Sequence, residues 1–317
     1  MNKIKVNLII FNIFFLFIFN NTLNAESNFY IVTKVDNEII TNIDIVQEAN
    51  YLIALNNDLR KIDKNSLFNL AKNSLIREKI KKNELNKYNK HKLFINENNI
   101  LEKLIENFYK NLNLKDINEF KKYLVNYNLD LSSVENKIKT EILWNQHIYS
   151  KYANQININQ ENLKKKVEQN KYVDNKVTKY LLSEILFTLE NKKDFEMKNI
   201  EIREKIKENG FKTAANIYSV TDTAKFGGRI GLVDERRLSK NILYHIKSIN
   251  PGEITNTINV PNGYLILKLD EVVIEEFKKD LKKELDNLIK FETDRQLNQY
   301  SIIYFNKIKL NSKISHE

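Results

Sequence analysis

The chain has 317 residues, 42% of them hydrophobic, and a formal net charge of +10 at pH 7. It contains no cysteine, which excludes disulfide bonds, thiol catalysis and thiolate metal sites. Lysines mix with glutamates on helical segments such as 79–84 and 278–284, so we interpret them as solvated faces and expect no nucleic-acid partner. The Gly227-Gly228 pair lacks the Gly-Lys-Ser/Thr ending of a phosphate-binding loop. We therefore expect no nucleotide, and we expect neither a metal nor any other cofactor.

The first 25 residues have the three-part layout of a secretory signal peptide. Two lysines precede an apolar run from Val6 to Phe19, and Leu23-Asn24-Ala25 offers a small-residue cleavage site. The run is shorter than the roughly 20 residues that a membrane-spanning helix needs. We therefore predict export to the periplasm and a mature chain that begins at Glu26. The alternative is an uncleaved anchor, and only in that case do we expect the membrane as a partner.

Glycine and proline divide the mature chain into two kinds of structure. Neither residue occurs between Glu26 and Asn209, whereas all six glycines and both prolines lie between Gly210 and Gly263. A long stretch without these residues is typical of helices, and a glycine-bearing stretch with short apolar runs is typical of an α+β unit.

The part over 26–172 is predicted to be a helical module. Two short strands, 29–35 and 38–40, precede a helix that begins at Thr41 with a capping box to Asp44 and extends to about Ala54. Apolar residues at helical spacing between Leu67 and Ile80 indicate a second helix. Further helices are expected at 96–112, at 117–126, from a capping box at Ser132 through Ile148, and at 158–170.

The segment 176–272 is predicted to be an α+β domain. Its expected elements are a strand at 176–187, helices at 194–209 and 213–218, a glycine-rich loop at 226–231, a helix at 238–248 and a strand at 263–271. A helical pattern then covers 273–309 and leaves a tail at 310–317. Because one amphipathic helix cannot bury its apolar stripe alone, we expect it to dock on the N-terminal helices. The predicted fold is thus mostly α and multidomain, with the α+β domain inserted in the helical module.

Several stretches resemble known families. The octapeptide 34–41, Lys-Val-Asp-Asn-Glu-Ile-Ile-Thr, followed by a helix, is similar to the opening of the SurA family of periplasmic chaperones, as are segments 129–145 and 156–159. Segment 218–231 resembles the loop of parvulin-type (PpiC) rotamases that ends in Gly-Gly-x-Leu-Gly, and 251–254 and 263–269 resemble the two closing motifs of that family. The resemblance implies a SurA-like chaperone with a single parvulin-type rotamase domain.

The resemblance also places the polar residues that surround a prolyl peptide in parvulins. The family usually has a histidine in the first strand, a Cys or Asp in the loop and a histidine in the last strand. Here these positions carry Glu184, Thr221 and Leu265, so we assign no catalytic residue. Glu184 could pair with Arg229 or face water, Thr221 could merely order the loop, and Leu265 could be plain core. The apolar wall of the cup that would bind the peptide falls on Ile230, Val233, Leu238 and Ile242.

These features predict an ATP-independent holdase for unfolded exported chains, with outer-membrane β-barrel precursors as the expected clients. Its parvulin-like domain is expected to have weak or no isomerase activity. The alternative is an active peptidyl-prolyl cis-trans isomerase, because an apolar cup alone could favour the twisted amide over the planar forms. A membrane-tethered folding factor is a third hypothesis, if the signal is kept. Whether the chain is an enzyme therefore stays open from the sequence.

Overall fold

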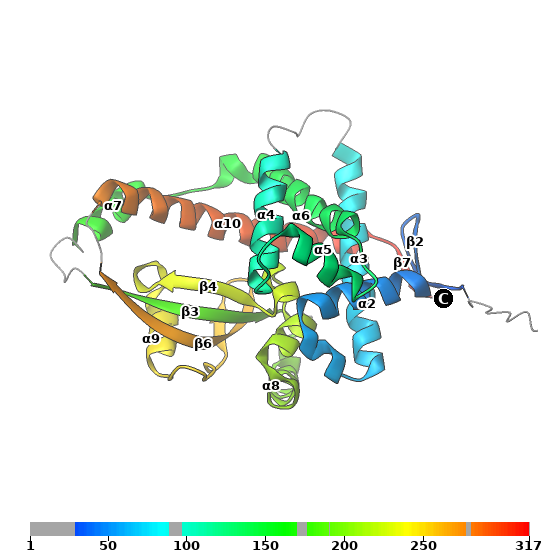
Figure 1. The fold of residues 1–317 in the computed structure, drawn as a ribbon. Coiled ribbons are helices and arrows are strands. Elements are labelled where there is room, and N and C mark those ends of the chain that lie inside the picture. The colour runs from blue at the N-terminus through cyan, green and yellow to red at the C-terminus, as the bar shows by residue number, and fades with distance from the viewer. Residues whose placement is uncertain (1–28, 89–96, 170–175, 190, 277–279, 317) are drawn as a thin grey trace, which may run out of the picture. The chain divides into compact units, whose positions relative to one another are not determined.

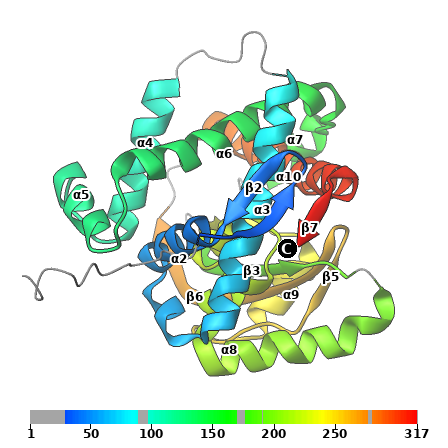
Figure 2. The same cartoon turned by 90° about the vertical axis from the view of Figure 1, so that its right-hand side faces the viewer.

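A three-stranded antiparallel sheet joins segments from both ends of the chain. The computed structural model describes residues 29–88, 97–169, 176–189, 191–276 and 280–316, so the predicted signal peptide lies outside the described residues. β1 (Ile31–Val35) pairs with β2 (Glu38–Thr41) on one side and with β7 (Ile314–His316) on the other (Figures 1 and 2). Residues 314–316 are thus a strand and not part of a tail. β1 supplies their backbone hydrogen-bond partners from the other end of the chain, so the local sequence of 314–316 did not predict this strand.

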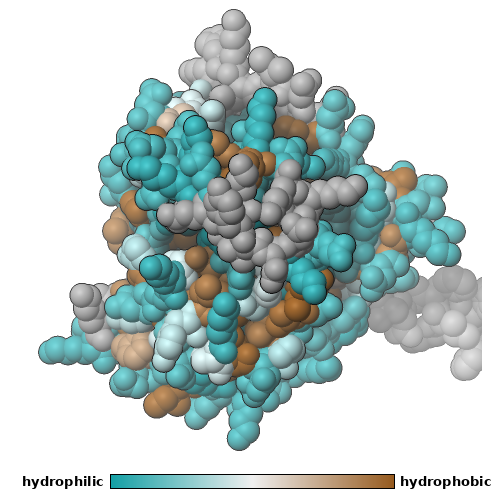
Figure 3. Space-filling view, turned by 90° about the vertical axis from the view of Figure 1, so that its left-hand side faces the viewer, coloured by the Kyte–Doolittle hydropathy of each residue, from teal (hydrophilic) through white to brown (hydrophobic). Residues whose placement is uncertain are grey.

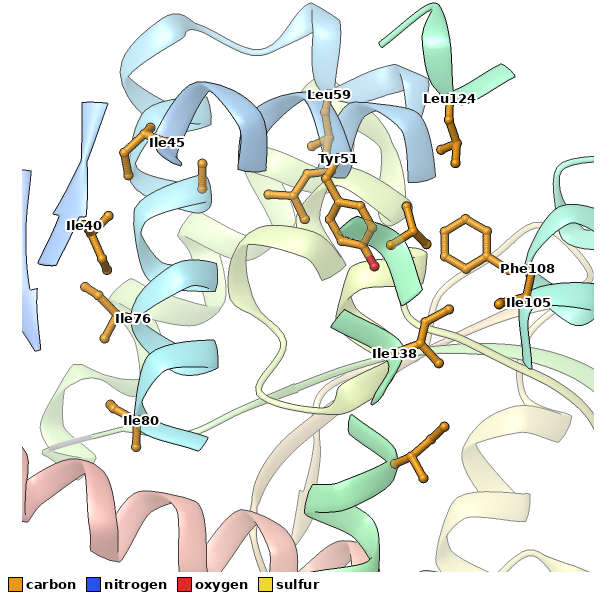
Figure 4. Packing of buried hydrophobic residues seen from close by; sticks show 14 of the residues in the cluster. Ile40, Ile45, Tyr51, Leu59, Ile76, Ile80, Ile105, Phe108, Leu124 and Ile138 are labelled. Atoms are coloured by element: carbon orange, nitrogen blue, oxygen red, sulfur yellow. The ribbon is translucent and has the colours of Figure 1, made fainter. Parts of the chain in front are cut away.

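Five helices of the helical module share one apolar core. They are α2 (Asn42–Leu55), α3 (Lys64–Tyr88), α4 (Glu97–Asn111), α5 (Ile117–Val125) and α6 (Leu131–Tyr152), with the 3-10 turns η1 (Asn57–Lys61) and η2 (Ala153–Gln155). Figure 4 shows Tyr51 of α2, Phe108 of α4 and Ile138 of α6 pointing toward one another in this core. The helical periodicity of the sequence therefore marked the buried faces correctly.

Helix caps explain where two of these helices begin. The Thr41 hydroxyl accepts from the Asp44 amide at 3.2 Å and the Asp44 carboxylate accepts from the Thr41 amide at 2.8 Å, which confirms the predicted capping box. The prediction for α6 was wrong by two residues. Its N-cap is Asp130, whose carboxylate accepts from the Ser133 amide at 2.6 Å, because an ionised carboxylate satisfies the free amides of the first turn.

The α+β domain is built on a second antiparallel sheet with the order β4-β3-β6-β5. Its strands are β3 (Lys176–Phe187), β4 (Arg229–Asp234), β5 (Ile258–Val260) and β6 (Gly263–Glu276). β6 therefore continues through residues 273–276, which the sequence placed in a helix. The run Val272-Val273-Ile274 favours a strand, since β-branched side chains pack well on a pleated surface, and it pairs with β3 between Thr178 and Tyr180.

Helices cover both faces of this sheet. On one face α8 (Phe195–Tyr218) packs Ile202 and Phe211 against Ile185 and Ile266. On the other face α9 (Lys240–Lys247) closes a second apolar cluster. Gly210 has φ 82° and ψ 162° and divides α8 into the two helices that the sequence predicted. The 3-10 turns η4 (Lys192–Asp194), η5 (Asp222–Phe226) and η6 (Glu235–Arg237) complete the domain.

The C-terminal helix α10 (Leu281–Asn311) docks back on the helical module, as predicted, although it begins eight residues later than expected. It packs against α3, α6 and α7 (Gln160–Gln169). The indole of Trp144 on α6 stacks on Tyr304 with the ring centroids 5.9 Å apart, and its N–H donates to Ser301 Oγ at 2.8 Å. α10 also reaches the α+β domain, where Glu284 forms an ion pair with Arg236.

All the elements above belong to one compact unit that begins at Ile31. Phe29 and Tyr30 precede it, and both side chains are exposed. Within the described ranges, no helix combines the length and the hydrophobicity needed to cross a membrane.

Candidate functional site

A row of polar side chains links β3 to the loop between α8 and β4. The hydroxyl oxygen of Thr221 lies 3.0 Å from that of Ser219 and 2.7 Å from that of Thr223. Thr223 Oγ1 in turn donates to Glu184 Oε1 at 2.9 Å. Ser219 Oγ accepts from the Leu186 amide at 3.1 Å, which anchors the row to β3. The structure thus brings Glu184 and Thr221, both singled out from the sequence, into one hydrogen-bonded chain.

Glu184 contributes a partly buried carboxyl group at the first-strand position. Burial raises the pKa of Glu184 above its ordinary value, and the hydrogen bonds from Thr223 and Thr221 act in the opposite direction. The sequence left open whether this carboxylate pairs with Arg229 or faces water. The structure places the Thr223 hydroxyl at the carboxylate, so a polar network replaces both alternatives. Such a group can accept or donate a hydrogen bond, but it is no imidazole.

The Gly-Gly pair lets the loop pass directly over β3. At Gly228 the backbone has φ +77°, and an added Cβ would lie 2.1 Å from the Glu184 carbonyl oxygen. The Gly228 carbonyl accepts from the Glu184 amide at 2.7 Å, so the close approach is itself a hydrogen bond. Only glycine tolerates this combination of backbone angle and proximity. The close passage of the loop over β3 at Glu184 therefore requires the glycine of the motif at position 228.

Leu265 lies on β6, in the apolar cluster that α9 covers. It pairs with Leu186 in the sheet and is 7% exposed. Of the four predicted cup residues, Val233 is buried in the same cluster and Leu238 and Ile242 pack against it. Ile230 instead lies on the edge strand β4 and is 41% exposed. The structure thus gathers three of the four around Leu265 and leaves the fourth at the edge of the sheet.

Charged residues of the helical module contact this loop, and the sequence did not reveal it. Lys81 Nζ on α3 lies 2.7 Å from Glu141 Oε2 on α6 and 3.2 Å from Asp222 Oδ1 of η5, and the Lys81 side chain is 3% exposed. Lys225 Nζ of η5 lies 3.4 Å from Glu141 Oε1. Burial opposes the ionised form of Glu141, but the charges of Lys225 and Lys81 hold its pKa at about 2. These four residues, which we call the interdomain charge cluster, come from three separate parts of the sequence.

A polar cavity of about 120 Å³ lies beside this cluster, between the helical module and the loop. Ser219 and Thr221 of the polar row line it, together with Tyr51, Arg77 and Lys137 of the helical module. Two further hydrogen bonds join the modules there: Arg77 donates to the Val220 carbonyl of the loop at 3.3 Å, and the Asn56 side-chain amide donates to Asn216 Oδ1 near the end of α8 at 2.8 Å. Among the described residues, no cluster of His, Asp or Glu side chains could hold a metal ion.

Comparisons with known proteins agree with the domain that the motifs indicate. Residues 178–271 match the rotamase family model described as the PPIC-type PPIASE domain. A crystal structure of a PpiC-type peptidyl-prolyl cis-trans isomerase domain is 27% identical and covers 32% of this chain and 94% of its own, with a TM-score of 0.28.

Two longer structures are also similar to this chain. One comes from work on PEB4 and Cj1289, two structurally related SurA-like chaperones of Campylobacter jejuni; it is 19% identical and covers 90% of this chain and 98% of its own, with a TM-score of 0.36. The other is the peptidylprolyl isomerase PrsA from Bacillus anthracis, 19% identical over 76% of this chain and 97% of its own, with a TM-score of 0.30. No curated protein matches the chain. Residues 178–271 of this chain are therefore a rotamase domain of the PPIC type.

Proposed function

We propose that this chain is an ATP-independent holdase that binds unfolded segments of exported proteins in the periplasm. Its PPIC-type domain contributes a binding surface and has weak or no isomerase activity. One observation carries the proposal: the three positions at which parvulins usually hold a prolyl peptide between polar groups carry Glu184, Thr221 and the buried Leu265. A domain without its imidazoles is easier to explain as a binding unit than as an enzyme.

The physical argument concerns what the twisted prolyl amide needs. Rotation about the peptide bond has a barrier of roughly 20 kcal/mol, and a catalyst must bind the twisted form more tightly than the planar forms. Leu265 offers only apolar contact, which planar and twisted peptides share. Glu184 alternates along β3 with Leu182 and Leu186, which share the apolar cluster of Leu265, so the polar row borders this cluster. Peptide binding without strong rate enhancement follows from the apolar side chain at the last-strand position.

Exposed apolar side chains support the holdase role. A chain that holds unfolded polypeptides must present apolar surface to them, since burial contributes about 25 cal/mol per Å². Figure 3 shows one face of the molecule, on which hydrophobic residues form patches between hydrophilic ones. Large apolar residues exposed by 40% or more occur in both the helical module and the PPIC-type domain; they include Leu104, Val125, Tyr149, Leu232 and Tyr244.

The periplasmic location is supported by the signal layout of residues 1–25 and by the absence of cysteine, which suits an oxidising compartment. Outer-membrane β-barrel precursors are the clients we propose, because they cross this compartment unfolded and are rich in aromatic residues. Sequencing the N-terminus of the protein from a periplasmic extract tests the location. We expect Glu26 there, and a species that retains Met1 in the membrane fraction would contradict it.

A coupled assay tests the function. The same preparation is given a proline-containing peptide, whose isomerisation is followed, and an unfolded porin diluted from urea, whose aggregation is followed by light scattering. We expect suppressed scattering and isomerisation at the uncatalysed rate, with a time constant on the order of tens of seconds. The matched variant with Glu184→His and Leu265→His restores the imidazoles. Isomerase activity of the unmodified chain at the level of active parvulins would contradict the proposal, and so would unsuppressed scattering.

The cup residues give a second, independent test. The double variant Leu238→Ser with Ile242→Ser should lose binding of a proline peptide, each change costing about 1–3 kcal/mol. It should still suppress porin aggregation, provided that circular dichroism shows it to be folded. Loss of both activities in a folded variant would move client binding into the cup.

An active isomerase remains the second candidate, and the buried polar row favours it. Thr221 and Glu184 retain a hydrogen-bonded cluster at two of the three family positions, and the pKa of Glu184 is raised by burial. If this cluster catalyses rotation, Thr221→Val will lower the isomerisation rate without changing aggregation suppression.

A further inference from the structure

The edge strand β4 of the PPIC-type domain is open along part of its length. Among the residues that the structure describes, it pairs with β3 alone, at the end of the order β4-β3-β6-β5. Its last two residues are covered: Val233 is 7% exposed, and Asp234 is 9% exposed and paired with Arg236. Its first residues are not covered, since Ile230 is 41% exposed and Leu232 is 51% exposed. An edge with exposed apolar side chains is a template for pairing with another extended chain.

Proteins usually protect such an edge with inward-pointing charges, proline or a covering segment. β4 has a register shift opposite Leu182 and Ser183, but its open part carries the apolar residues Ile230 and Leu232. Phe226, in the turn just before β4, is 40% exposed and packs edge-on against Phe108 of α4 with the ring centroids 5.7 Å apart. The apolar surface at the edge therefore continues onto the helical module.

The exposed face of α4 extends this surface. Ile100, Leu104 and Phe108 follow one another at four-residue steps and so lie on one side of the helix, each about 6 Å from the next. Ile100 is 42% exposed and Leu104 is 40% exposed, whereas Phe108 is buried at the contact with Phe226. A strand added to β4 would thus find apolar partners beyond its own end.

We propose that the open part of β4, residues 229–232, binds an extended segment of an unfolded client as an added strand. This inference rests on the proposed holdase function and names the surface that carries it. Edge pairing fits only an extended backbone, because the unpaired N–H and C=O groups of an edge bond to main chain whatever the sequence. Apolar residues at alternate positions of the client would contact Ile230, Leu232 and the surface of α4.

Charge decides between a client and a second copy of this chain. Arg229 is exposed at the open end of the edge, and the chain has a formal net charge of +10. Two copies that met at β4 would bring like charges together, whereas a client segment with acidic residues between its apolar ones would be attracted. We therefore commit to an extended client segment with alternating apolar and acidic residues.

Hydrogen–deuterium exchange on the full chain tests the inference. The probes are an unfolded porin diluted from urea and a synthetic peptide of alternating leucine and glutamate. We expect either probe to slow the exchange of the backbone amides over 229–232 by about tenfold or more, as new hydrogen bonds require. The same peptide with alternate backbone amides methylated keeps its apolar side chains but cannot pair, and it should give no protection.

A matched pair of variants provides the second readout. Leu232→Lys places a charge on the open edge, and Leu310→Lys makes the same change at a leucine of α10 that is 87% exposed. Both should fold, since both side chains already face water. We expect Leu232→Lys to weaken binding of the peptide about tenfold and Leu310→Lys to leave it unchanged.

The outcomes separate the inference from the function on which it rests. A chain that binds the porin without protection at 229–232, or equal binding by the two variants, overturns the edge as the client site and leaves the holdase function intact. Protection that appears without any probe, together with a dimer mass in light scattering, overturns it in favour of self-pairing. A chain that neither binds the porin nor suppresses its aggregation overturns the proposed function itself.

Discussion

The interdomain charge cluster makes a quantitative prediction for the variant Glu141→Gln. In the native structure Lys81 is almost fully buried, and its ammonium group has Glu141 at 2.7 Å and Asp222 at 3.2 Å. At an effective dielectric constant of about 20, the attraction across 2.7 Å is on the order of 6 kcal/mol before desolvation. Removing one partner of a buried pair typically costs about 3–5 kcal/mol, because the other charge stays buried. Asp222 remains, so we expect a loss of roughly 3 kcal/mol in the free energy of unfolding.

Two further variants isolate the pair. Asp222→Asn should cost no more than about 1 kcal/mol, because the Asp222 side chain is 44% exposed and solvent screens it. The double variant Lys81→Met with Glu141→Gln removes both charges and should recover much of the loss. Urea unfolding is the assay, and the chain's single tryptophan reports on it directly, since Lys81 Nζ lies 5.4 Å from the centroid of the Trp144 ring. A loss below about 1 kcal/mol for Glu141→Gln, or a double variant no more stable than Glu141→Gln alone, would refute the reasoning.

Three other predictions follow from single contacts. Gly228→Ala should destabilise the PPIC-type domain by several kcal/mol in thermal unfolding, because its Cβ would lie 2.1 Å from the Glu184 carbonyl oxygen. Gly252→Ala is the control: Gly252 also has a positive φ of +95°, but its Cβ would meet nothing within 4 Å, so the change should cost only about 1–2 kcal/mol. Burial lowers the pKa of His147 below 6.5; the nearby Lys151 lowers it further, and Glu84 raises it. This histidine therefore binds a proton more readily in the unfolded chain than in the folded one. The contribution of His147 to stability should therefore be full above about pH 6.5 and fall as the pH drops below that value. If the urea midpoint of His147→Gln depends on pH as strongly as that of the unmodified chain, this prediction is contradicted. A chain that ends after Glu276 lacks α10, so Trp144 should lose its stacking partner and the helical module should unfold at lower urea; an unchanged midpoint would show that α10 is dispensable.

Local signals predicted most of the elements, and the errors have physical causes. The capping box at Thr41 was sufficient because its hydrogen bonds lie within a few residues. Along 263–269 the alternating pattern was sufficient because it is a local signal of a strand, although the partners lie far away on β3. The continuation of β6 through 273–276 was missed because Val273, Phe277 and Leu281 also fit helical spacing, and only the pairing with β3 selects the strand. Strand β7 was missed because β1, at the other end of the chain, supplies its hydrogen bonds.

In the candidate site too, some residues were predicted from the sequence and others were not. The resemblance to parvulins placed Glu184 and Thr221 at two positions of one polar cluster, and the structure joins them through Thr223. The charge cluster left no sequence signal, since Lys81, Glu141 and Asp222 are ordinary helix-surface or loop residues in their local context. Lys81 is buried where the loop docks on α3 and α6. A lysine on a polar helical face was interpreted as solvated, and for this residue that interpretation is wrong.

The same docking explains why the two modules form one compact unit. The loop of the PPIC-type domain supplies Asp222 and Lys225, and the helical module supplies Lys81 and Glu141, so two ion pairs, Lys81–Asp222 and Lys225–Glu141, join the modules. Separating the modules would expose these groups to water, which solvates charges well, and would therefore cost less than removing a single partner in the docked state. The interface is thus held by complementary charges with a few direct hydrogen bonds, such as that between Asn56 and Asn216. Such an interface orients the loop while leaving the exposed apolar residues of α4 and β4 available to other chains.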